Sequence, residues 1–236
     1  MATFVRYLTE EEQRRLWKTI RMQSGNAVAR RDLAWMQFLC ETGLRLGEFA
    51  LVTVGDALAA LRSGYLFIPK ENRKGRVTTP AAAGKKRRPP EDLEILLTEE
   101  RRRLLRELLA VRAEITQVAD GHVDEPLVVG RGGNGMTERA YEKRVSHWGV
   151  LAGMPDRLSP HWFRHTLAKN VMRHSTAKDP RGVVKAMLGH KSIASTGIYT
   201  DVDREDVAQA IAETERRGRR APRKGLRADY DRRTES

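Results

Sequence analysis

The stretch LSPHWFRHTLA gathers His161, Arg164 and His165 around two large aromatic residues. On a helix these three positions fall within about 100° of arc, so three donor groups share one face. The HxxxH spacing would place both imidazoles on one zinc ion. However, Trp162 stands where a metalloprotease helix carries its Glu, and Arg164 would lie beside the cation. A phosphate-binding cluster and an ordinary solvated helix face are both compatible with the pattern.

Two further stretches contain residues with related chemistry. In CETGLRLGEFALV, Arg45 follows a glycine turn and Glu48 stands three residues later, a spacing that lets the carboxylate pair with the guanidinium. In MLGHKSIASTGIYTDV, His190 follows a glycine at the expected end of a helix, and Tyr199 comes nine residues later. Taken one at a time, these are also consistent with a surface ion pair and a packed tyrosine.

The elements expected to position these residues are mostly helices. Thr9 is a good N-cap for a helix over LTEEEQRRLWKTI. An apolar face from Arg31 to Thr42, followed by Gly43, predicts a second helix. A short helix is expected to begin near Leu46. Three β-rich runs further along, ALVTV, GYLFI and LEILL, predict a small antiparallel sheet.

Helices also dominate the second half of the sequence. Thr98 and Thr137 are predicted N-caps, the second for a helix that runs to Leu151. The HWFRH helix is expected to begin at Pro160. Its buried ridge, spaced four residues apart, would consist of Phe163, Leu167 and Val171. With two short helices over PRGVVKAMLGH and DREDVAQAIAETE, the sequence predicts a mainly α fold with a small antiparallel β-sheet, of the α+β class.

The chain is strongly basic. Its 236 residues include 44 Lys and Arg against 31 Asp and Glu, a formal net charge of +13. Such a balance attracts polyanions, of which nucleic acid is the usual one. The single cysteine, Cys40, excludes an intrachain disulfide and a cysteine-based zinc finger. No apolar run approaches about 20 residues, so we expect no membrane partner and a soluble intracellular protein.

Taken together, the motifs TGLRLGE, HWFRH, LGH and Tyr199 resemble those of the tyrosine recombinase (phage integrase) family, in the family's order and at its usual spacings. The resemblance spans roughly Tyr7 to Val207 and implies the family's catalytic domain, which is mainly helical with a small antiparallel sheet. Members of the family are site-specific DNA recombinases, such as integrases, transposases and invertases. They cleave and rejoin DNA strands without a metal ion or other cofactor.

The resemblance implies catalytic roles for the motif residues. Tyr199 matches the nucleophile that attacks a DNA phosphorus, displaces the 5′-oxygen and leaves a 3′-phosphotyrosyl link. Arg45 and Arg164 match the two arginines that bind the nonbridging oxygens. His161 matches a base or donor near the tyrosine, and His190 matches a second phosphate donor.

Supporting roles are implied for two neighbours of these residues. Glu48 matches the acidic position that orients the first arginine, and His165 is expected to support the second. The family's general acid is a lysine in the turn between the second and third strands, which protonates the leaving 5′-oxygen. Lys74 in RKGRVTT fits this position best. Because the connection is longer than the usual turn, other candidates stay open, namely Lys70, Lys85 and Lys86.

The resemblance also implies partners and a domain organisation. Family members usually carry a DNA-clamping domain before the catalytic one. This chain begins where the catalytic domain should, so we expect either an excised fragment or a short member without a clamp. We expect the catalytic domain to occupy residues 1–215, with a basic, disordered tail over 216–236. The implied partner is double-stranded DNA, and the implied location is the bacterial cytoplasm, at the nucleoid. The resemblance also implies a tetramer on DNA, in which the four copies exchange the C-terminal helix.

Two other functions share parts of this pattern. A catalytically inactive DNA-binding accessory protein would keep the fold, but it would have no need of Tyr199 or His161. A type IB topoisomerase uses the same tyrosine, arginine and lysine chemistry to relax supercoils without exchanging partners. The motifs of topoisomerases differ in the region of LGH and Tyr199, so the spacing of these two motifs in this chain favours a recombinase.

Overall fold

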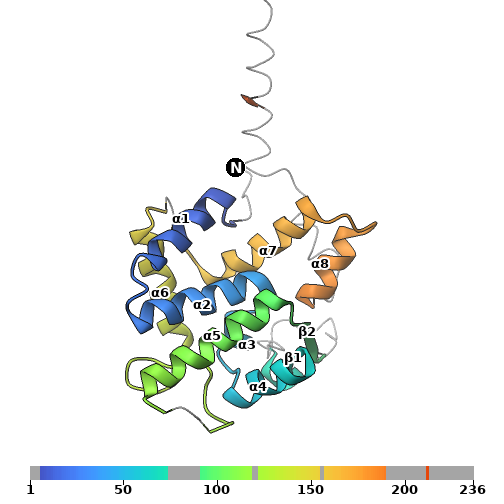
Figure 1. Cartoon of the computed structure of the whole chain (residues 1–236). Coiled ribbons are helices and arrows are strands. Elements are labelled where there is room, and N and C mark those ends of the chain that lie inside the picture. Colours follow the sequence, from blue (N-terminus) through green and yellow to red (C-terminus); the bar gives the residue numbers. More distant parts are fainter. Residues whose placement is uncertain (1–5, 74–90, 119–121, 155–156, 190–210, 213–236) are drawn as a thin grey trace, which may run out of the picture. The chain divides into compact units, whose positions relative to one another are not determined.

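The computed structural model describes residues 6–73, 91–118, 122–154, 157–189 and 211–212 (Figure 1). The elements within Arg6–Tyr199 form one unit. In chain order they are α1 (Glu10–Arg21), α2 (Ala27–Thr42), α3 (Leu46–Phe49), α4 (Val54–Ser63), β1 (Tyr65–Ile68), η1 (Lys70–Asn72), β2 (Leu93–Leu96), α5 (Glu99–Thr116), α6 (Glu138–Leu151), α7 (Pro160–His174) and α8 (Pro180–Leu188). The predicted mainly α fold with a small antiparallel sheet is confirmed.

Helix α2 lies at the centre of this unit, and α1, α5 and α7 pack against it (Figure 1). It begins four residues before the predicted start at Arg31, because the side chain of Asn26 caps it by accepting a hydrogen bond from Val28 N at 2.8 Å. Its predicted end is confirmed, with Gly43 as the C-cap. Because neighbours cover it on several sides, most of its residues are buried, including Trp35, Met36, Leu39 and Cys40.

The three predicted threonine caps are confirmed. Each hydroxyl accepts a hydrogen bond from a backbone N–H in the first turn of its helix: Thr9 from Glu12 at 3.2 Å, Thr98 from Arg101 at 3.4 Å and Thr137 from Ala140 at 3.2 Å. The helices α1, α5 and α6 therefore begin one residue after these caps. These bonds satisfy donors that a helix N-terminus otherwise leaves open.

The sheet has two described strands, which pair antiparallel with Tyr65 opposite Leu96 and Ile68 opposite Leu93. The prediction of a strand over ALVTV, the first of the three β-rich runs, is wrong. Its last valine, Val54, begins α4, and Thr53 makes a reciprocal capping pair with Asp56 through bonds of 2.9 and 3.1 Å. The T-x-x-D spacing that favours this cap was present in the sequence, although the β-branched run obscured it.

The predicted buried ridge of α7 is only partly correct. Phe163 is fully buried, but Leu167 and Val171 are half-buried. The helix instead packs against several elements, namely α2, α8 and α6, and also against the N-terminal segment. Trp17 of α1 stacks on Phe163 with ring centroids 6.0 Å apart, and Thr166 Oγ1 accepts a hydrogen bond from Leu8 N at 2.9 Å. Packing against these several neighbours explains why polar residues of α7 are also buried, namely Arg164, Thr166 and Lys169.

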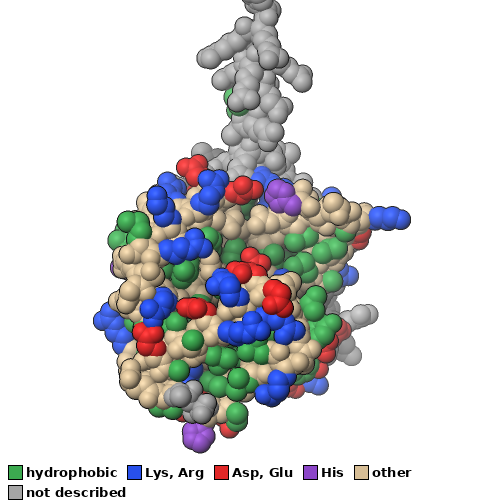
Figure 2. Space-filling view, in the orientation of Figure 1, with side chains coloured by type: hydrophobic (Ala, Val, Ile, Leu, Met, Phe, Trp, Pro, Cys, Tyr) green, Lys and Arg blue, Asp and Glu red, His purple; other side chains and the backbone are tan. Residues whose placement is uncertain are grey.

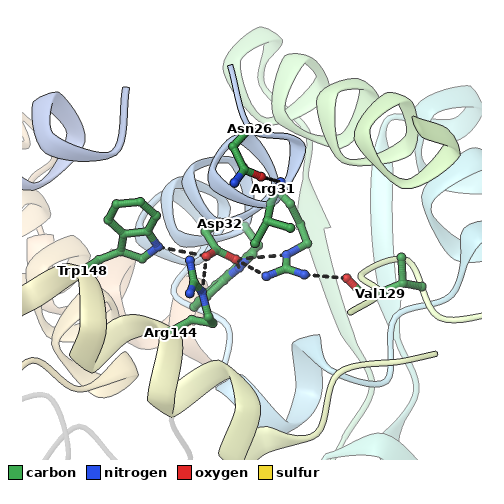
Figure 3. Close-up of polar contacts among 8 residues, drawn as sticks. Asn26, Arg31, Asp32, Val129, Arg144 and Trp148 are labelled. Atoms are coloured by element: carbon green, nitrogen blue, oxygen red, sulfur yellow. Dashed lines mark hydrogen bonds and ion pairs between the residues drawn. The ribbon is translucent and has the colours of Figure 1, made fainter. Parts of the chain in front are cut away.

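A buried carboxylate joins α2 to α6 (Figure 3). Asp32 is fully buried, and its Oδ2 accepts hydrogen bonds from Arg144 Nε at 2.5 Å and Trp148 Nε1 at 2.9 Å. Its Oδ1 accepts from Arg31 Nη2 at 2.6 Å and from Trp35 Nε1 at 3.1 Å. Two cations and two indoles therefore compensate the charge of Asp32.

The face seen in Figure 2, over α5, carries Lys and Arg interspersed with Asp and Glu. It is therefore not a patch of a single sign. None of the helices in the described ranges combines the length and apolar character needed to span a bilayer. Of the predicted helix DREDVAQAIAETE only Ile211 and Ala212 are described, so that helix and the expected boundary after residue 215 stay predictions.

Candidate active site

The predicted site residues divide into two groups. The first group lies in the described part of the chain. Most of its residues lie on α3, α7 and the turn between α2 and α3, namely Arg45, Glu48, His161, Arg164 and His165, and the alternative lysine Lys70 begins η1. Lys74, Lys85, Lys86, His190 and Tyr199 lie outside the described residues. The described part of the site therefore consists mainly of the two arginines, the acid and the two histidines of α7.

The turn after α2 is built around Gly43. This residue has a φ of 67°, in the left-handed region that glycine adopts without steric cost. A Cβ at this position would lie 2.5 Å from Leu188 Cδ2 and 2.9 Å from Leu167 Cδ2. Two features therefore favour glycine here: the backbone conformation is unfavourable for residues with a side chain, and α7 and α8 approach the position closely.

Arg45 is the N-cap residue of α3, and Glu48 orients it. The Glu48 carboxylate accepts hydrogen bonds from Arg45 Nη1 at 2.9 Å and from Arg45 N at 3.1 Å. The Arg45 side chain is 37% exposed, whereas that of Glu48 is only 2% exposed. The acid is therefore a buried anchor, and the guanidinium that it holds is accessible to an anion from solvent.

Helix α3 is itself held in place by aromatic packing. The fully buried Phe49 lies against Phe38 of α2, with ring centroids 5.8 Å apart, and against Tyr141 of α6 at 6.0 Å. Tyr141 in turn makes an edge contact with Trp35 at 4.9 Å. Because α3 is only one turn long, this packing is what fixes the direction in which Arg45 leaves the backbone.

Arg164 of α7 reaches the same turn from the other side. Its Nη1 donates to the carbonyl of Gly43, and its Nη2 donates to the carbonyl of Leu188 at 2.7 Å. The side chain is only 5% exposed. Arg164 therefore joins the ends of α2 and α8, and the two predicted arginines lie on either side of one tight turn.

A third arginine, which belongs to none of the sequence motifs, contacts the same acid. Arg73 is 8% exposed, and its Nε donates to Glu48 Oε1 at 3.4 Å. Nothing in the run PKENRKG distinguishes this arginine from its basic neighbours, and only the fold brings it to Glu48.

The two histidines of α7 differ in environment. His161 is exposed at the start of the helix, and its ring centroid lies 6.3 Å from that of His165 one turn later. Burial, together with the positive charges of His161 and Arg164, lowers the pKa of His165 to about 4. His165 is therefore neutral at physiological pH and adds no charge next to Arg164.

The arrangement suits an anion. It offers the Arg45 guanidinium at the surface, with its backing acid buried and two further guanidiniums close behind. Among the described residues, no three His, Cys, Asp or Glu side chains are grouped to hold a metal ion. A cavity of about 420 Å³ lies between α1, α7 and α8, but its lining contains none of the predicted site residues.

Comparison with known proteins shows the family. The family model described as the phage integrase family matches residues 6–206, so the chain belongs to that family. Among curated relatives, the tyrosine recombinase XerC of Vibrio parahaemolyticus is 28% identical over 201 residues, covering 85% of this chain and 56% of the relative. The tyrosine recombinase XerD of Pseudomonas putida is 29% identical over 194 residues, covering 82% and 57%. The chain thus spans little more than half the length of these relatives.

Solved structures show the same fold. The XerA recombinase matches with a TM-score of 0.62 and 23% identity, over 90% of this chain and 66% of that one. The XerH recombinase bound to difH substrate, in a pre-cleavage complex, matches with a TM-score of 0.60 and 20% identity, over 89% and 55%. The predicted tyrosine recombinase catalytic-domain fold is confirmed.

Proposed function

We propose that this chain is the catalytic part of a site-specific DNA recombinase, which cleaves and rejoins DNA strands through a 3′-phosphotyrosyl intermediate. The observation that carries the proposal is the hydrogen bond from Arg164 to the turn that bears Arg45, in a chain of the phage integrase family. Two guanidiniums at one turn suit phosphoryl transfer, in which charge is spread over the nonbridging oxygens. The tyrosine recombinase relatives support the same activity.

The first chemical step forms one bond and breaks another at the same phosphorus. The phenolic oxygen of Tyr199 attacks phosphorus, and the bond from phosphorus to the 5′-oxygen breaks. His161 takes part as the base or donor near the phenol, while Arg45, Arg164 and His190 bind the nonbridging oxygens. The phosphodiester is replaced by a phosphotyrosyl ester, so its bond energy is retained for rejoining.

The leaving 5′-oxygen needs a proton, and we assign this step to Lys74, with Lys70, Lys85 and Lys86 as the alternatives. Rejoining reverses the step: the 5′-hydroxyl of a partner strand attacks the phosphotyrosyl phosphorus and releases Tyr199. A role for each of these groups at one phosphate is consistent with the exposed Arg45 and its buried anchor Glu48.

The proposed partner is double-stranded DNA, bound by a tetramer whose members exchange the C-terminal helix. Sequence charge supports the first part. Residues 74–90 contain six Lys and Arg and no acid, and residues 215–236 contain nine against four. Phosphate contacts from such segments would make binding strongly dependent on salt. We also propose residues 1–215 as the catalytic domain, with 216–236 as a basic tail, and a site of action at the nucleoid.

The test is covalent capture of DNA. The probe is nicked duplex DNA with a randomised target region. Repeated rounds of selection enrich the molecules that stay attached to wild-type protein on denaturing gels, where only covalent adducts survive. Cleavage next to the nick releases a short strand, so the adduct cannot be reversed. Wild type is expected to form the adduct in EDTA as well as in magnesium, and Tyr199→Phe is expected to form none.

The alternatives give other results. A DNA-binding accessory protein would retard the same duplexes without forming any adduct, and that result would contradict the proposal. A type IB topoisomerase would form the adduct and relax a supercoiled plasmid that lacks the selected sequence. A recombinase is expected instead to exchange strands between two duplexes, and only when both duplexes carry the selected sequence.

A further inference from the structure

Arg73 is a buried arginine to which the chemistry proposed above gives no role. It follows η1 directly, and its backbone N–H donates to Lys70 O at 3.1 Å. Arginines are seldom buried without charged or hydrogen-bonding partners. The contacts of the guanidinium therefore identify what this residue holds in place.

Each nitrogen of the Arg73 guanidinium meets a different segment of the chain. Nε donates to Glu48 Oε1 at 3.4 Å, and Nη1 donates to the carbonyl of Glu91 at 2.7 Å. Nη2 lies against the backbone of Gly189, so closely that a Cβ there would collide with it. Gly189 has a φ of 59° and is the C-cap of α8, where the helix dipole favours a cation.

The contact with Glu48 links Arg73 to the proposed phosphate-binding arginine. Glu48 is a single buried carboxylate between two guanidiniums, since its Oε1 also accepts the hydrogen bond from Arg45 Nη1 at 2.9 Å. An isolated pair of Arg45 and Glu48 has no net charge, whereas the trio with Arg73 carries one positive charge. With Arg73 present, Glu48 can orient Arg45 without cancelling the field that Arg45 presents to an anion.

We propose that Arg73 is a positioning residue for strand cleavage: by sharing Glu48 and holding the end of α8, it keeps Arg45 aimed at the scissile phosphate. The inference rests on the proposed recombinase function and extends it to a residue outside the motifs. Arg73 acts through Glu48 and Arg45, and it does not itself touch the DNA. Its loss is therefore expected to slow cleavage rather than to weaken DNA binding.

The experiment compares wild type with Arg73→Gln on the captured nicked duplex. The single-turnover rate constant of adduct formation is expected to fall on the order of 100-fold, because small misplacements of a charge-stabilising group have effects of this size. DNA affinity, measured by fluorescence anisotropy, is expected to change by less than about threefold, since the number of phosphate contacts is unchanged. Arg73→Lys keeps the charge but cannot reach all three partners, and is expected to be intermediate.

A second substrate separates positioning from mere folding. In a methylphosphonate at the scissile position, a methyl group replaces one nonbridging oxygen and removes the negative charge that Arg45 would bind. If Arg73 acts through Arg45, the defect of Arg73→Gln shrinks on this neutral substrate, in parallel with that of Arg45→Ala. If Arg73 had only a structural role, its loss would lower the rate constant by the same factor on the phosphodiester and on the methylphosphonate.

Arg112 provides a matched control. It is buried like Arg73, at 5% exposed against 8%. Its Nε donates to the carbonyl of Pro126 at 3.0 Å and its Nη2 pairs with Glu125, so its polar partners are not site residues. Arg112→Gln is expected to lower the free energy of unfolding. Any change in its rate constant of adduct formation is expected to be the same on the phosphodiester and on the methylphosphonate. If Arg73→Gln is too unstable to assay, Arg73→Lys is compared on the two substrates instead.

The outcomes separate this inference from the proposed function. If wild type forms no adduct, the proposed function fails first. If wild type forms the adduct and Arg73→Gln forms it equally fast, Arg73 is not a positioning residue, although the recombinase assignment stands. Equal slowing on the phosphodiester and the methylphosphonate would also overturn the inference.

Discussion

Arg164 Nη1 donates a hydrogen bond to the backbone carbonyl of Gly43, although the two residues are 121 positions apart in the chain. The bond connects α7 to the end of α2. A side chain at Gly43 would collide with Leu167 of α7 and Leu188 of α8. One tight turn therefore determines the relative positions of three helices. The two proposed phosphate-binding arginines depend on it together.

Gly43→Ala is expected to lower the free energy of unfolding by about 3 kcal/mol, because it combines an unfavourable φ with overpacking against two leucines. Urea denaturation measures the change. Gly153→Ala is the matched control, since Gly153 also has a positive φ of 64° but has open space around it. It is expected to cost only about 1 kcal/mol, the backbone contribution alone. Equal losses in the two variants would contradict the role of close packing at Gly43.

Asp32→Asn is expected to lower the free energy of unfolding by about 3–5 kcal/mol, because the buried charge of Arg31 and the partly exposed charge of Arg144 lose their common partner. Thermal and urea denaturation would both detect it. Glu114→Gln removes the acid of an exposed pair with Arg30 and is expected to cost about 0.5 kcal/mol or less. A small effect at Asp32 would mean that the indole and guanidinium donors are satisfied in another way.

Local signals were sufficient to predict most of the helices. The caps at Thr9, Thr98 and Thr137 were readable because an N-cap is a contact between residues close in sequence. The β-branched run ALVTV was misleading for the same reason. Two local signals compete there, the strand preference of the run and the capping pair of Thr53 with Asp56. The packing of α4 against β1 and α5, which is not local, favours the helix.

The contacts between distant segments could not be predicted from sequence. The motifs identified Arg45, Glu48 and Arg164, but the role of Gly43 as their common support depends on α8, which lies far along the chain. Arg73 carried no signal at all, because its partners Glu48 and Gly189 come from other elements. The predictions for Tyr199, His190 and Lys74 concern residues outside the described ranges and stay predictions.

Cys40 is expected to be inert in the folded protein. Burial, with a smaller contribution from Glu41, raises the pKa of its thiol to about 12, so almost none is present as the reactive thiolate. At about pH 8, a disulfide reagent such as DTNB is expected to label it only after denaturation. An exposed cysteine, made as Ser24→Cys in a Cys40→Ser background, is the control and is expected to react at once. Rapid labelling of native Cys40 would show that α2 opens locally.

Arg164→Ala is expected to abolish most cleavage while DNA binding persists. The lost transition-state stabilisation would be on the order of 3 kcal/mol or more. The measurement is the single-turnover rate constant on the captured duplex, with DNA affinity determined in parallel. Because Arg164 also supports Gly43 and Leu188, Arg164→Lys is assayed beside it to retain the charge. An unchanged rate constant in Arg164→Ala would remove Arg164 from the proposed mechanism.

The lowered pKa of His165 is expected to make the folded protein less stable at acidic pH. Its pKa is about 4 in the folded protein, mainly because of burial, against an ordinary value of 6.5. The unfolded chain therefore binds the proton more tightly, and stability falls as the pH decreases through the range between these two values. The loss is expected to reach about 2 kcal/mol, once solvent screening of a partly exposed ring is allowed for.

The measurement is the free energy of unfolding across this pH range for wild type and for His165→Gln. The variant cannot be protonated at this position, so its curve is expected to be flatter by the same amount. His122→Gln, which replaces an exposed histidine, is the control and is expected to follow wild type. If His165→Gln keeps the wild-type slope, the acid sensitivity arises from other groups, and the neutral imidazole beside Arg164 is not what limits stability at low pH.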